Sequence, residues 1–150
     1  METPQLSSLY QQLILEHYRN PRNKAELDEK TVEIHMANPV CGDEIRLQLR
    51  IDDNQIVEAK FVGQGCSISQ AAISMMTTKL QGASLDEADA LAARFTELMH
   101  GDEEAAKDKS LGDLRALQGV SKFPVRIKCA LIGFDALQEA LKKHASESPH

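Results

Sequence analysis

A run of strict alternation between apolar and polar residues constrains the fold of this chain more than any other feature. The alternating apolar residues are Ile45, Leu47, Leu49 and Ile51. This pattern is typical of a strand with one buried face. Similar patterns predict strands at 31–37 and 56–62, and residues 52–54 predict a turn. Because the connections between the three strands are short, we expect an antiparallel meander.

Helical patterns lie on both sides of the predicted strands in the sequence. Ser84 and Glu87 form a capping-box pattern, which predicts a helix start. The predicted helices cover 6–19, 67–81, about 84–99, 111–117 and about 125–143, and a charged, loop-like segment lies at 102–110. The sequence therefore predicts one α+β domain over residues 1–150, with a three-stranded antiparallel sheet against several helices and a frayed tail at 145–150.

Composition excludes several classes of function. The chain of 150 residues has a net charge of −6, and 4% of its residues are aromatic. A nucleic-acid-binding protein needs a basic surface, so we expect no nucleic-acid partner. The sequence contains neither a stretch of about 20 apolar residues nor a signal-peptide pattern, so we expect a cytoplasmic protein with no membrane partner. Its three cysteines cannot all pair in disulfides, which favours metal or thiol chemistry over the alternative of buried structural cysteines.

The cysteines occupy positions that a compact fold can bring together at one edge of the sheet. Cys41 lies in a loop between two strands, Cys66 lies where a strand ends and a helix begins, and Cys129 lies in the first turns of the last helix. Asp43 follows Cys41 with one glycine between them. Three sulfur atoms and one oxygen form a tetrahedral set suited to zinc, and thiolates also accept iron–sulfur species. The spacing of the cysteines alone matches no zinc-finger pattern.

The motifs around the cysteines are more specific than their spacing. They are Asn-Pro-x-Cys-Gly-Asp at 38–43, Gly-Cys-Ser-Ile-Ser-x-Ala at 65–71 and Arg-Ile-Lys-Cys-Ala at 126–130. With these motifs the chain resembles the NifU N-terminal/IscU-like scaffold family, from the first helix to about residue 143. The resemblance implies the SufE/NifU-type fold, and it matches Cys41, Asp43, Cys66 and Cys129 to the metal-binding positions of the family.

Two features resemble the SufU branch of this family. Lys128 precedes the last cysteine, where IscU-like scaffolds carry a histidine, and an extra segment lies at about 83–110. The resemblance implies a zinc-dependent sulfurtransferase that accepts persulfide sulfur from a SufS-type cysteine desulfurase and passes it to downstream Suf cluster-assembly proteins. One alternative is a scaffold that assembles a [2Fe–2S] cluster on the same cysteines. Another is a structural zinc domain that mediates protein contacts.

Two residues are expected to act in sulfur transfer. Cys41 is the expected mobile zinc ligand and sulfur acceptor, because its loop is bounded by proline and glycine. Once released, its thiolate could attack the terminal sulfur of a donor persulfide. Arg126 lies about one helical turn before Cys129 and could stabilise a thiolate or contact the desulfurase. Gly65 is expected to allow a close approach of the chain beside Cys66, and His17 is expected to be a packed core histidine.

Overall fold

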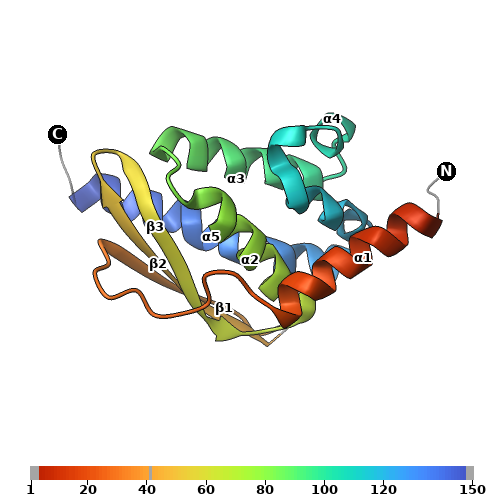
Figure 1. Cartoon of the computed structure of the whole chain (residues 1–150), viewed down its shortest axis with the longest axis horizontal. Coiled ribbons are helices and arrows are strands. Elements are labelled where there is room, and N and C mark those ends of the chain that lie inside the picture. Colours follow the sequence, from red (N-terminus) through yellow and green to blue (C-terminus); the bar gives the residue numbers. More distant parts are fainter. Residues whose placement is uncertain (1–3, 41, 148–150) are drawn as a thin grey trace.

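The computed structural model describes residues 4–40 and 42–147 of the chain. Figure 1 shows the sheet at one end of an elongated molecule, with the helices along and beyond it. The elements are α1 (Pro4–Arg19), β1 (Val32–Asn38), β2 (Asp43–Asp52), β3 (Gln55–Gln64), α2 (Ser67–Leu80), α3 (Leu85–Met99), α4 (Glu103–Ala106), the 3-10 segment η1 (Lys109–Lys122) and α5 (Pro124–Glu147).

The sheet is the antiparallel meander that the alternating patterns predict. Its strand order is β1-β2-β3, and both neighbouring pairs are antiparallel. The β2–β3 connection is tight: Asp53 and Asn54 have φ values of 54° and 61°. Positive φ at both central residues characterises the hairpin turn that matches the twist of the strands, and Asn and Asp tolerate it. The predicted α+β class, a three-stranded antiparallel sheet against several helices, is confirmed.

Helices α2 and α5 cover the apolar face of the sheet. Helix α5 packs against β1 and β2, and α2 packs against β3 and α5 (Figure 1). Phe134 of α5 is 1% exposed and stacks on Phe95 of α3, with ring centroids 4.4 Å apart. The extra segment at 83–110 therefore contributes to the hydrophobic core through α3.

The crossing of α2 and α5 depends on a glycine. A Cβ atom at Gly133 of α5 would lie 2.6 Å from Cγ1 of Ile73 and 3.5 Å from Cε of Met76, both on α2. A contact of 2.6 Å is too short for carbon atoms, so a larger residue at Gly133 would force the two helices apart. Cys129 lies one turn before Gly133 on α5, so this crossing also determines how close α5 brings Cys129 to α2.

A buried histidine connects α1 to the helices that follow the sheet. His17 is 3% exposed, as expected for a packed histidine. Its Nδ1 lies 2.8 Å from Oγ of Ser74 in α2, and its Nε2 lies 3.1 Å from Oδ2 of Asp113 in η1. Both ring nitrogens are therefore paired, as buried polar groups require.

The segment between α3 and α5 is more regular than the sequence predicts. The capping box at Ser84 and Glu87 is confirmed at the start of α3. The loop expected over 102–110 contains α4, and the short helix expected over 111–117 is part of η1. Helix α5 continues beyond the predicted end at 143 to Glu147, and the last residues of the predicted frayed tail lie outside the described part of the chain.

Side-chain hydrogen bonds explain this regularity. Asp102 accepts a hydrogen bond from the backbone N–H of Glu104 and thereby starts α4. Asp108 accepts hydrogen bonds from Ser110 and from the guanidinium of Arg94 in α3, which together lower the pKa of Asp108 to about 2. The segment is thus tied back to α3 by local polar contacts.

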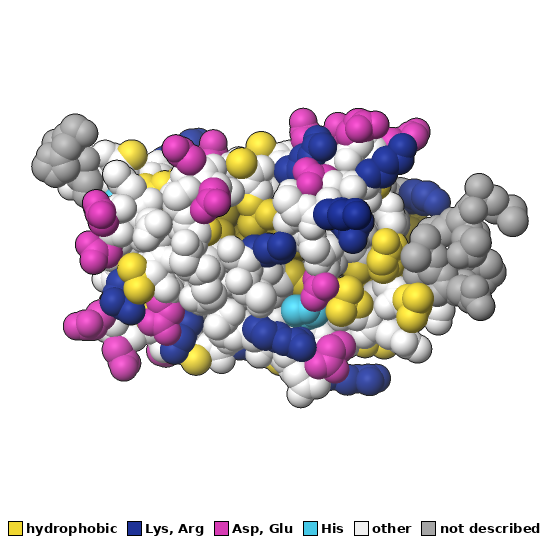
Figure 2. Space-filling model, turned by 45° about the horizontal axis from the view of Figure 1, so that its top comes forward, with side chains coloured by type: hydrophobic (Ala, Val, Ile, Leu, Met, Phe, Trp, Pro, Cys, Tyr) yellow, Lys and Arg dark blue, Asp and Glu magenta, His cyan; other side chains and the backbone are white. Residues whose placement is uncertain are grey.

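The surface of the molecule carries charges of both signs. Figure 2 shows acidic and basic side chains interspersed over the face that it displays. Among the described residues, no helix is both long enough and apolar enough to cross a membrane.

Candidate metal centre

Asp43 is placed in the site by the alternation of buried and exposed side chains along β2. It is the first residue of that strand and pairs with Asn38, which closes the hairpin between β1 and β2. Because alternate residues of a strand share one face, Asp43 lies on the same face as Ile45 and Leu47. Its side chain therefore points toward the helices and is only 2% exposed. A carboxylate in this position needs partners.

Cys66 enters the site at the N-terminus of α2. It is the N-cap residue of that helix, but its side chain makes no capping hydrogen bond. Instead, its backbone N–H donates a hydrogen bond of 2.9 Å to Oδ1 of Asp43. The partial positive charge at a helix N-terminus also favours an anionic ligand here.

Cys129 enters the site from the second turn of α5 and is fully buried. Its Sγ lies 3.8 Å from the carbonyl oxygen of Val125, four residues earlier in the helix. Since α5 is anchored against the sheet and α2 along much of its length, the position of Cys129 is set by the core.

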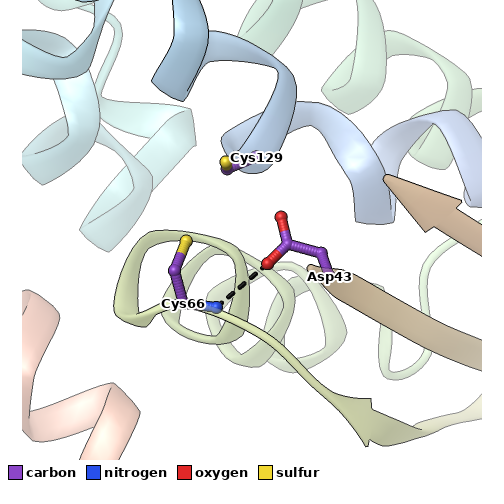
Figure 3. Close-up of side chains that lie close together, drawn as sticks. All are labelled: Asp43, Cys66 and Cys129. Carbon is purple, nitrogen blue, oxygen red and sulfur yellow. Dashed lines mark hydrogen bonds between the residues drawn. The ribbon is translucent and has the colours of Figure 1, made fainter. Parts of the chain in front are cut away.

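The three side chains converge on one point. One ligand atom from each of Asp43, Cys66 and Cys129 lies within 4.8 Å of the others. Figure 3 shows the two sulfur atoms and the carboxylate facing a common space between β2, α2 and α5. Oδ2 of Asp43 is buried and has no hydrogen-bond partner among the described residues. A buried carboxylate oxygen without a described partner, beside two cysteine sulfur atoms, fits a cation that prefers sulfur ligands.

Two of the predicted site residues remain to be placed. Cys41, the predicted fourth ligand and sulfur acceptor, lies outside the described residues. Arg126 is exposed on the first turn of α5. It borders a groove of about 540 Å³ that also includes Tyr10, Ile14, Ile68, Val120 and Phe123. Ile68 follows Cys66 by two residues, so this groove begins beside the candidate metal centre.

The structure adds one residue that the sequence analysis did not single out. Ser69 is fully buried in the first turn of α2, and its Oγ lies 3.0 Å from Oδ1 of Asp43. The expected close approach at Gly65 is confirmed, because a Cβ there would lie 2.5 Å from Oγ of Ser69 and even closer to Oδ1 of Asp43. Two sequence signals could have pointed to Ser69: it is a fixed position of the motif at 65–71, and it lies three positions after the helix N-cap.

Comparison with known proteins identifies the class of protein that this fold and site define. Residues 9–130 match the family model described as the NifU-like N terminal domain, and the chain belongs to this family. It is 46% identical to the zinc-dependent sulfurtransferase SufU of Bacillus subtilis, over 92% of each chain. It is 40% identical to the iron–sulfur cluster assembly scaffold protein IscU of Streptococcus pyogenes, over 97% of this chain and 91% of that one.

A solved structure agrees with these relatives. The crystal structure of an iron–sulfur cluster assembly scaffold protein for the SUF system from Fervidobacterium islandicum superposes with a TM-score of 0.80 at 28% identity. The alignment covers 86% of this chain and 93% of the other. The family resemblance carried by the three cysteine motifs is therefore confirmed.

Proposed function

We propose that this chain is a zinc-dependent sulfurtransferase of iron–sulfur cluster assembly. It would accept persulfide sulfur from a SufS-type cysteine desulfurase and pass it to downstream cluster-assembly proteins. The observation that carries the proposal is the convergence of Asp43, Cys66 and Cys129, with Oδ2 of Asp43 buried and unpaired. The 46% identity to a relative named for this activity supports the same conclusion.

Four residues would hold the zinc ion: Cys41, Asp43, Cys66 and Cys129. Cys41 is joined to Asp43 through one residue, so the Cα atoms of the two lie within about 7.6 Å of each other. Three thiolates and one carboxylate complete a tetrahedral set. When bound, zinc keeps the thiols deprotonated at neutral pH.

Sulfur transfer would use the thiolate of Cys41 as the nucleophile. The thiolate attacks the terminal sulfur of the desulfurase persulfide, and a new S–S bond forms on Cys41. The S–S bond within the donor breaks, and the desulfurase cysteine leaves as a thiolate. No net oxidation or reduction occurs. We assign the acceptor role to Cys41 because Cys66 and Cys129 are fixed on helices that the core holds in place.

Arg126 would serve the encounter with the desulfurase. It is exposed at the edge of the groove, and Phe123 and Val125 next to it are also exposed. Exposed apolar side chains provide contact area for a protein partner, and the guanidinium of Arg126 beside them provides a positive charge.

The scaffold alternative is favoured by the IscU relative, which is 40% identical. The same thiolates accept zinc or an iron–sulfur cluster. The metal and sulfide content of protein purified without oxygen, together with desulfurase turnover, distinguishes the two functions. One zinc ion per chain, no acid-labile sulfide and faster desulfurase turnover support the sulfurtransferase, whereas equal amounts of iron and sulfide without acceleration support the scaffold.

The structural-zinc alternative makes a different prediction about chelation. The buried core of the sheet, α2, α3 and α5 is apolar and extends well beyond the site. We therefore expect the chain to remain folded when a chelator removes the metal. Unfolding under mild chelation, with no effect on a desulfurase, would support the structural alternative.

Asp43→Ala is expected to weaken zinc affinity by at least about 100-fold. Removing a residue that only supports a ligand lowers metal affinity by up to about 100-fold, and removing the ligand itself should cost at least as much. The variant loses one ligand and leaves the N–H of Cys66 without its acceptor. Asp43→Asn removes the negative charge of the ligand but keeps an oxygen that can accept the hydrogen bond from Cys66. It therefore separates the loss of the charged ligand from the loss of the hydrogen-bond acceptor. Zinc affinity is measured by competition with a chromophoric chelator.

Glu44→Ala is the matched control for Asp43. Glu44 is the next residue of β2, but its side chain is exposed and pairs with His35. Its removal is expected to leave zinc affinity unchanged. A zinc affinity of Asp43→Ala equal to that of the wild-type chain would contradict the ligand assignment.

A further inference from the structure

We propose that Ser69 is a positioning residue that holds the carboxylate of Asp43 so that only Oδ2 faces the metal. This inference rests on the proposed zinc site and extends it to a residue that is not itself a ligand. It assigns the two oxygens of Asp43 to different tasks.

The hydrogen bonds of Oδ1 support this division. Oδ1 accepts one bond from the backbone N–H of Cys66, at 2.9 Å, and one from the hydroxyl of Ser69, at 3.0 Å. A carboxylate oxygen has two lone pairs, and both are used here. Oδ2 has no partner among the described residues. The carboxylate therefore presents one occupied oxygen to α2 and one available oxygen to the cysteines.

The space around Oδ1 is also filled. Gly65 brings the backbone so close that an added Cβ would collide with Oδ1 of Asp43 and with Oγ of Ser69. The carboxylate is thus enclosed by the turn at Gly65 and by the first turn of α2. This enclosure restricts movement of Asp43 without any contact to the metal.

The hydroxyl of Ser69 has one proton and several neighbours. It lies 3.1 Å from the carbonyl oxygen of Cys66 and 3.9 Å from Sγ of Cys66. A charged acceptor forms the stronger hydrogen bond, so the proton is directed to Oδ1 of Asp43. Without this bond, Oδ1 keeps only the N–H of Cys66 and can rotate toward the metal.

Ser69→Ala is therefore expected to lower zinc affinity about 10-fold to 100-fold, the range found when an outer-sphere partner of a ligand is removed. Ser67→Ala is the matched control. Ser67 lies in the same first turn of α2 but is partly exposed. Affinity is measured on metal-free full-length protein by chelator competition. Circular dichroism of the metal-free variants checks that each is folded.

Two further measurements distinguish positioning from a general loss of structure. In the Asp43→Ala background, Ser69→Ala is expected to have no additional effect on zinc affinity, because its effect passes through Asp43. The visible spectrum of the Co²⁺-substituted protein reports coordination number, and we expect Ser69→Ala to change its d–d bands while Ser67→Ala does not. Gly65→Ala disturbs the same carboxylate from the other side and is expected to change the bands as well.

The outcomes separate this inference from the proposed function. If the wild-type chain does not bind zinc, the zinc site itself is wrong. If it binds zinc no better than Asp43→Ala, Asp43 is not a ligand and the role of Ser69 is overturned with it. If the wild-type chain binds tightly and Ser69→Ala matches Ser67→Ala in affinity and spectrum, only the role of Ser69 is overturned. The role of Ser69 is also overturned if Ser69→Ala lowers zinc affinity by the same factor in the wild-type chain and in the Asp43→Ala background. If Ser69→Ala does not fold, Ser69→Gly takes its place: a Co²⁺ spectrum equal to that of Ser67→Ala overturns the inference and a changed one supports it.

Discussion

Replacing Cys41 with alanine is expected to abolish sulfur transfer to this chain while leaving it folded. The variant lacks the thiol to which we assign the acceptor role, and the positions of Cys66 and Cys129 at buried helices leave neither free to move toward a donor persulfide. Asp43 and Cys129 are buried, and the apolar core extends well beyond the site, so we expect the variant to keep its fold. Persulfide formation is measured by mass spectrometry after incubation with a cysteine desulfurase and cysteine. Desulfurase turnover is expected to fall to its rate without this protein.

Val40→Ala is the matched control for Cys41. Val40 is the preceding residue in the same loop and is 72% exposed, so truncation changes the loop without removing a thiol. We expect this control to accept sulfur. Persulfide on Cys41→Ala at the wild-type level would show that Cys66 or Cys129 is the acceptor.

Phe134→Ala is expected to lower the free energy of unfolding by about 3–5 kcal/mol, the range for removing a large aromatic side chain from a core. Phe134 is almost fully buried and stacks on Phe95, so the variant leaves a cavity between α3 and α5. Urea unfolding followed by circular dichroism measures the loss. Since α5 also carries Cys129, we expect weaker zinc binding in the same variant.

Phe123→Ala provides the corresponding control for stability. Phe123 immediately precedes α5 and is 61% exposed. Removing an exposed side chain is expected to change the free energy of unfolding by less than about 0.5 kcal/mol. A similar loss from both phenylalanine variants would contradict the role of the α3–α5 contact in the core.

The strands were predictable because their pattern has a direct physical cause. The period of two in β2 determines which face is buried, and the same period places Asp43 on that face. The segment 102–122 was less predictable. Its helical turns depend on hydrogen bonds at Asp102 and Asp108 rather than on a long apolar period, and such local bonds leave little trace in the sequence.

The site was only partly predictable for a related reason. The sequence places Asp43, Cys66 and Cys129 at the ends of elements, and this is where the structure brings them together. Their separation depends on how closely α2 and α5 cross, which the contact between Gly133 and Ile73 determines. A pattern of cysteines carries no information about that crossing, or about the hydrogen bond from Ser69.

The crowding at Gly65 and Gly133 has a consequence for classifying other sequences. Both positions exclude a Cβ, one beside the carboxylate of Asp43 and the other between the two helices that carry the cysteines. A homologue could keep every cysteine and the aspartate and still be unable to close the same centre if either glycine were replaced by a larger residue. These two glycines therefore form a stricter diagnostic signature than the ligands alone, and they offer a way to separate metal-competent homologues from degenerate ones.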